Sequence, residues 1–122
     1  MIFLLLFLPF DELDHEKSIY ELGKYRQTVA QYRDEVKTLE AKISKLSKLK
    51  PCDERLGLIE IHMDLIYWSV DDSIDGLERA ERLFKAGQYA KVRTAVAARD
   101  DSLGKTNASI LLIEDLLRRK NR

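Results

Sequence analysis

Apolar residues recur along this sequence at intervals of alternately three and four residues, in three separate stretches. The first stretch has eight such positions and no polar interruption: Leu22, Tyr25, Val29, Tyr32, Val36, Leu39, Ile43 and Leu46. This spacing lines up one apolar stripe on a helix, as knobs-into-holes packing between helices requires. The stretch therefore predicts a long helix that buries one face.

Two further stretches repeat the same spacing, with a few polar residues among the apolar ones. The second stretch consists of Leu56, Ile59, Met63, Ile66, Val70, Ser73, Leu77, Ala80 and Phe84. The third stretch consists of Tyr89, Val92, Val96, Arg99, Leu103, Thr106, Ile110, Ile113 and Leu117. Chance rarely sustains this spacing over three heptads, so we expect three helices whose stripes pack together.

Two short segments interrupt the helical pattern. Pro51 disfavours helical backbone at the residue before it, and Asp53 is well suited to cap the start of a second helix. Gly87 can adopt the left-handed conformation that often ends a helix. We expect helices over about residues 16–50, 53–86 and 88–120, forming one domain from 16 to 120. Helices of similar length joined by short turns predict an all-α, antiparallel up-down-up three-helix bundle.

The overall composition agrees with a helical bundle. The chain has 122 residues, which suits one domain, and at 45% hydrophobic residues it is too apolar to be disordered. Two prolines and five glycines leave few helix breakers. The 21 basic and 21 acidic residues give a net charge of zero, which argues against a nucleic-acid-binding domain.

Charge is distributed unevenly among the predicted helices. Residues 17–50 carry nine basic and four acidic residues, a net charge of +5. Residues 53–81 carry two basic and nine acidic residues, a net of −7, and residues 82–122 carry ten and four, a net of +6. The alternation of basic, acidic and basic segments suits a middle helix that packs beside both of its neighbours. Such charge pairing favours a particular register of the helices more than it adds stability. The alternative is that these charges simply form solvated faces.

Residues 1–10 form a separate apolar segment with the sequence MIFLLLFLPF. It is too short to span a bilayer, which needs about 20 residues, and it lacks the basic residue and cleavage site of a signal peptide. Three interpretations stay open: a tail packed on the bundle or a partner, an atypical secretion signal or membrane-inserting tip, or the end of a membrane helix that begins upstream. The last two interpretations predict a membrane-associated protein. The acidic residues that follow the segment slightly favour a location outside the cytoplasm, and the cytoplasm is the alternative.

No group of residues predicts an active site, a metal centre or a cofactor. Glu12 and His15 have the Glu-x-x-His spacing of di-iron bundles, but the second such motif is missing. The aspartates in residues 71–75 lack the glycine pattern of a calcium loop. Cys52 has neither a second cysteine nor a histidine at a suggestive spacing. We therefore expect a protein that is not an enzyme and holds no metal.

The polar positions within the stripes predict a polar layer halfway along the bundle. Folding the chain at its two breaks brings five polar side chains to one level: Tyr32, Asp72, Ser73, Asp75 and Arg99. We expect Arg99 to meet Asp72 or Asp75, with the hydroxyl of Tyr32 contributing. Such layers fix the register of helices at some cost in stability. The alternative is that Arg99 extends into solvent.

Two basic clusters converge at one end of an antiparallel bundle. The first lies at the end of the first helix and contains Lys42, Lys45, Lys48 and Lys50. The second lies at the end of the chain and contains Arg118, Arg119, Lys120 and Arg122. Together they form a candidate binding surface for nucleic acid or another anionic surface.

Two resemblances to known families follow from these patterns. Three heptad-patterned helices over about 105 residues resemble a spectrin-type repeat, including the spectrin-like repeats of bacterial septation-ring regulators, which follow a membrane helix. Ala80 and the Gly87-x-Tyr89 turn resemble the middle of a tetratricopeptide repeat, although Arg99 stands where that family has alanine. The resemblances imply a three-helix architecture and a helical hairpin at Gly87, and no functional residue.

The sequence thus predicts a non-enzymatic helical structural or protein-interaction module, without a cofactor. We expect its partner to be another protein or a second copy of the chain. Residues 1–10 add a membrane as a candidate partner. Binding of nucleic acid or an anionic surface through the two basic clusters is the alternative.

Overall fold

A computed structural model of the protein describes residues 10–119. Within this range the chain forms three helices: α2 is Phe10–Leu49, α3 is Arg55–Lys85 and α4 is Tyr89–Arg118. These residues contain no strand, and the predicted all-α bundle is confirmed. The expected start of the first helix near residue 16 is wrong, because α2 already begins at Phe10. Acidic residues fill the next turns, and a helix N-terminus favours negative charge there.

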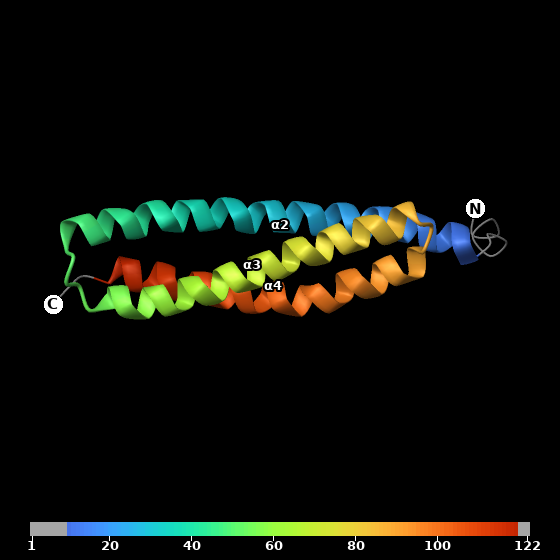
Figure 1. The fold of residues 1–122 in the computed structure, drawn as a ribbon. Helices are drawn as coiled ribbons and strands as arrows, with labels where there is room; N and C mark the ends of the chain where they lie inside the picture. The colour runs from blue at the N-terminus through green and yellow to red at the C-terminus, as the bar shows by residue number, and fades with distance from the viewer. Residues whose placement is uncertain (1–9, 120–122) are drawn as a thin grey trace.

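The chain reverses direction at both of the predicted breaks (Figure 1). Contacts between the helices agree with the picture, since Tyr25 of α2 meets Ser73 of α3, 48 residues later. Arg55 at the start of α3 bonds to the carbonyl of Leu116 near the end of α4. Phe10 and Arg118 therefore lie at opposite ends of an elongated bundle.

The turn between α3 and α4 depends on Gly87. Its φ of 75° lies in the left-handed region, where glycine is favoured because it lacks a Cβ. The amide of Gly87 donates to the carbonyl of Phe84 at 3.0 Å, and the amide of Gln88 donates to Leu83 at 2.9 Å. These two bonds form a Schellman motif, which satisfies carbonyls that the end of α3 would leave unpaired.

The turn between α2 and α3 is held by Asp53 and Arg55. Helix α3 begins at Arg55, not at residue 53, and Oδ1 of Asp53 accepts a 2.9 Å hydrogen bond from the amide of Arg55. The Asp53 carboxylate also accepts bonds from the Arg55 guanidinium at 2.9 and 2.7 Å. Arg55 in turn donates to the carbonyls of Leu116 and Arg119, so one side chain joins the start of α3 to the end of α4.

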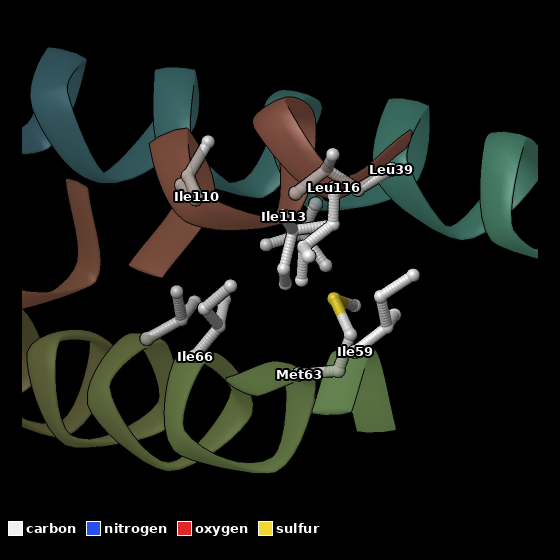
Figure 2. Close-up of a cluster of buried hydrophobic side chains, with 9 residues drawn as sticks. Leu39, Ile59, Met63, Ile66, Ile110, Ile113 and Leu116 are labelled. Atoms are coloured by element: carbon white, nitrogen blue, oxygen red, sulfur yellow. The ribbon is translucent and has the colours of Figure 1, made fainter. Parts of the chain in front are cut away.

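All members of the three apolar stripes are buried or half-buried. The core has one part near the Pro51 turn and one near the Gly87 turn. In the first part, labelled side chains of α4 point toward those of α3 (Figure 2): Ile110, Ile113 and Leu116 toward Ile59, Met63 and Ile66. Within the second part, Tyr25 and Val92 are almost fully enclosed.

The described helices include none that is long and apolar enough to cross a bilayer. The interpretations of the apolar N-terminal segment concern residues 1–9, which lie outside the described residues, and Phe10, which begins α2.

Candidate functional site

Arg99 and Asp72 of the expected polar layer form an ion pair between α4 and α3. Nη1 of Arg99 lies 2.6 Å from Oδ2 of Asp72, and both side chains are about one-third exposed or less. The Arg99 side chain crosses α3 at Gly76, where an added Cβ would lie 2.7 Å from Arg99 Cγ. The missing side chain of Gly76 therefore makes room for Arg99 to reach Asp72, one helical turn away.

Ser73 is fully buried, and the α2 residue whose hydroxyl reaches it is Tyr25. The hydroxyl of Tyr25 donates to the carbonyl of Ser73 at 2.9 Å, while Ser73 Oγ donates to the carbonyl of Ser69 at 2.8 Å. We expect Tyr32 to supply this hydroxyl, but it lies one heptad further along α2 and is half-buried there. Burial of its side chain, and to a smaller extent the negative charge of Glu35, raises the pKa of its hydroxyl. The end of α2 extends past the start of α3 (Figure 1). This offset places Ser73 beside an earlier residue of α2, Tyr25 in place of Tyr32.

Asp75, the last member of the expected layer, points away from it. Its side chain is exposed, and Arg99 pairs with Asp72 instead. The layer that the structure describes therefore consists of a buried hydrogen bond from Tyr25 to Ser73 and a partly buried ion pair between Arg99 and Asp72.

The end of α2, with the first basic cluster, and the end of α4, with Arg118 and Arg119 of the second, lie at the same end of the bundle (Figure 1). Lys42, Lys45, Lys48 and Lys50 are all exposed, and none of them belongs to an ion pair among the described residues. Arg118 is exposed, whereas Arg119 pairs with Asp115 at 2.7 Å. Lys120 and Arg122 lie outside the described residues.

A surface feature that the buried heptad pattern does not predict lies on the outer face of α3. Four large apolar side chains are 44, 59, 51 and 67% exposed there: Leu58, Ile61, Leu65 and Trp68, which we call the outer stripe. These residues have the same 3-4-3 spacing as the buried stripe of α3, and each lies two positions after a member of that stripe. Two residues turn a helix by about 200°, so α3 carries apolar stripes on opposite faces.

The part of α3 that carries the outer stripe is rich in acidic residues. Residues 56–78 contain no lysine or arginine, and they contain six acidic residues: Glu60, Asp64, Asp71, Asp72, Asp75 and Glu78. Among the ion pairs of the described residues, only that of Asp72 with Arg99 involves one of them. The apolar surface of α3 is therefore flanked by carboxylates with little local compensation.

A groove of about 540 Å³ runs between α2 and α3 on one side of the outer stripe. Its lining includes apolar Ile43, Ile59 and Met63 and three carboxylates, from Glu40, Glu60 and Asp64. Tyr67 lines it too, and burial, a hydrogen bond to Glu40, and the charges of Glu40 and Asp64 raise the pKa of its hydroxyl. Negative charge is thus concentrated along this side of the stripe.

His15 takes part in packing at the Gly87 end of the bundle. Its ring centroid lies 5.6 Å from that of Phe84 and 4.6 Å from that of Tyr89. Beside this cluster, Arg93 of α4 contacts Asp14 at 3.2 Å and Glu21 at 3.4 Å. The part of the chain that the structure describes contains no cluster of His, Cys, Asp or Glu that could hold a metal ion.

The fold and its surface define an all-α bundle with an exposed apolar stripe. No protein-family model matches the chain, and neither a curated protein nor a solved structure matches it. The likeness to spectrin-type and tetratricopeptide repeats therefore remains an expectation from the sequence.

Proposed function

We propose that this protein is a non-enzymatic helical module that binds another protein through the outer stripe of α3. The observation that carries the proposal is the regular spacing of four exposed apolar side chains on a helix whose opposite face already lies in the core. Single exposed apolar residues are common on soluble proteins, whereas contiguous apolar surface marks interaction sites.

Regularity distinguishes the outer stripe from the other exposed apolar side chains. The others on α2 and α4 stand singly or as sequence neighbours and form no row with this spacing: Ile19, Tyr20, Leu49, Leu111 and Leu112. Covering a half-exposed Leu, Ile or Trp contributes on the order of 1 kcal/mol, about half the value for full burial. Four such residues in a row therefore supply a core for an interface.

Site-specific photo-crosslinking in the native cells tests the proposal. A photoreactive amino acid in place of Ile61 should give a discrete protein adduct, which Leu65→Ser abolishes and the matched surface change Leu111→Ser leaves intact. The same photoreactive group in place of exposed Lys37 on α2 serves as the positional control. Equal adducts from both positions, or an adduct that survives Leu65→Ser in a folded protein, would contradict the proposal.

Membrane tethering through residues 1–10 is a separate part of the proposal, supported only by the apolar sequence MIFLLLFLPF. Fractionation of cells that express the full chain or a chain starting at Asp11 tests it. Loss of the protein from the membrane pellet on truncation supports tethering, and an unchanged distribution removes it.

Binding of an anionic surface is the second candidate function, and the exposure of four lysines at the end where α4 also terminates favours it. Binding through such lysines should weaken steeply as salt rises from about 50 to 200 mM, because counterions are released. Retention on immobilised DNA at low salt that is lost in Lys45→Glu/Lys48→Glu supports this function. No retention at low salt excludes it for nucleic acid.

A further inference from the structure

We infer that the segment which covers the outer stripe is a basic amphipathic helix of a partner protein. Its apolar face would pack on Leu58, Ile61, Leu65 and Trp68, while its lysines or arginines meet the carboxylates of the groove along the α2 side and Asp75 beyond Trp68. The inference rests on the proposed function, since it names the chemistry of the partner for the same surface.

Residues 1–9 are too few to cover the middle of this surface within one molecule. From Phe10 to Tyr25, α2 rises about 22 Å, and Tyr25 lies level with Ser73 of α3. Ile61 lies a further 18 Å or so along α3, toward the Pro51 turn. Nine extended residues span at most about 32 Å, so residues 1–9 fall short of the middle of the stripe.

A second copy of the chain is a poor occupant on electrostatic grounds. Packing the outer stripe against itself would bring together two α3 helices, each with six acidic and no basic residues between 56 and 78. Like charges across an interface oppose association. The outer face of α2 has polar side chains opposite its core, including Gln27, Gln31 and Thr38. Its exposed apolar side chains, Ile19, Tyr20 and Leu49, lie toward its two ends and form no row that could match the outer stripe.

The carboxylates lie where a helix seated on the stripe would place its basic residues. On the α2 side, the groove presents Glu40, Glu60 and Asp64. Along α3, the line of the stripe continues at the same spacing through Asp72 and Asp75, and Asp75 is exposed. The surface is thus apolar for about three turns, or 15 Å, and beyond Trp68 it presents exposed Asp75, while Asp72 is already paired with Arg99. A partner helix with an apolar face and a basic end matches both parts.

Trp68 makes the inference directly testable, because it is the only tryptophan of the chain and is 67% exposed on the stripe. The probes are three synthetic 18-residue peptides without aromatic residues: one with leucine on one helical face and lysine on the other, one with glutamate in place of lysine, and one that scrambles the first. We expect the basic amphipathic peptide alone to shift Trp68 emission to shorter wavelength. Its dissociation constant should be at least tenfold lower than those of the other two.

Matched variants locate the binding on the stripe. Leu65→Ser should weaken binding of the basic amphipathic peptide about tenfold or more, and Asp64→Asn/Asp75→Asn should weaken it several-fold and reduce its salt dependence. Leu111→Ser on α4, an equally exposed leucine, should leave binding unchanged. Equal binding of the acidic peptide, or equal binding by Leu65→Ser, would overturn the inference.

Sedimentation of the protein alone separates this inference from the proposed function. A dimer that Leu65→Ser converts to a monomer would assign the stripe to a second copy and overturn the basic-helix partner. A stripe-dependent cross-link to a partner without a basic amphipathic helix would overturn the inference and leave the proposed function standing. The absence of any stripe-dependent adduct would remove the proposed function itself.

Discussion

The side chain of Arg99 lies across Gly76, so close that a Cβ at this glycine would be 2.7 Å from Arg99 Cγ and 2.8 Å from Nε. Its guanidinium continues to Asp72, one turn earlier in α3. The ion pair between α3 and α4 thus depends on the absence of a side chain at residue 76.

Gly76→Ala should lower the free energy of unfolding by about 1 kcal/mol. Alanine favours a helix over glycine by about 1 kcal/mol, but Arg99 would have to move and leave Asp72, whose carboxylate would be left half-buried without its partner. Urea denaturation of the variant and the natural protein measures the difference.

The control for this prediction is Gly104→Ala on α4, where no atom lies within 4 Å of an added Cβ. This change should raise the free energy of unfolding by about 0.5–1 kcal/mol, since only the helix propensity changes. In an Arg99→Ala background, Gly76→Ala should no longer destabilise. Stabilisation by Gly76→Ala in the natural background would contradict the assigned role of Gly76.

Tyr25→Phe should destabilise the protein by about 1 kcal/mol, because it removes a buried hydrogen bond to the Ser73 carbonyl. Tyr32→Phe, one heptad away on the same face, should have a smaller effect. Thermal or urea unfolding of the two single variants measures both. Equal losses of unfolding free energy in the two variants would contradict the helix register in which Tyr25, and not Tyr32, bonds to Ser73.

Leu65 and Ile66 are neighbours in the sequence that face opposite environments, with 51% and 0% exposure. Ile66→Ala should lower the free energy of unfolding by about 2–5 kcal/mol, because it leaves a cavity in the core. Leu65→Ala should change it by less than about 0.5 kcal/mol. Comparable losses at the two sites would show that the outer stripe is buried in solution.

Asp53 should make stability depend on pH below about 4. Hydrogen bonds from the side chain and backbone of Arg55 lower the pKa of Asp53 from 3.8 to about 2. Because the pKa is lower in the folded state, this stabilisation is complete above the unfolded pKa and is lost as the pH falls through the folded pKa.

The variant Asp53→Asn tests this dependence through melting temperatures measured from pH 2 to 5. It should melt below the natural protein at pH 5, and the two should converge as the pH approaches 2. Asp34→Asn, an exposed aspartate on α2, is the control and should leave the curve unchanged. Parallel curves for Asp53→Asn and the natural protein would exclude the assigned bonds.

Periodicity predicted the buried faces of all three helices, including their polar members. Ser73 and Thr106 are buried within apolar stripes because their hydroxyls donate to the carbonyls of Ser69 and Ser102, four residues earlier. The polar atoms are therefore satisfied within their own helices, and the pattern can tolerate them. The position of a residue in the heptad was enough to place each of these side chains.

The same periodicity could not decide between Tyr25 and Tyr32. A shift of one heptad leaves the pattern of buried positions unchanged, so the register depends on where the turn places the start of α3 beside α2. Here α2 extends past that start (Figure 1), which the residues around Pro51 did not reveal.

The outer stripe was missed for a different reason. The stretch that contains Leu58, Ile61 and Leu65 is apolar on several faces, and one helical stripe sufficed to explain a core. A helix that packs against two neighbours still has a free face. The sequence signal for the outer stripe was the second row of apolar residues, two positions after the buried row.

The odd number of helices among residues 10–119 has a mechanical consequence. Because the 40-residue α2 is about 60 Å long, chains attached before Phe10 and after Arg118 would leave the bundle at opposite ends, roughly that far apart. Tension between them would act along the helix axes and shear the packed faces past one another. The bundle would then serve as a spacer of fixed length, with the outer stripe facing sideways.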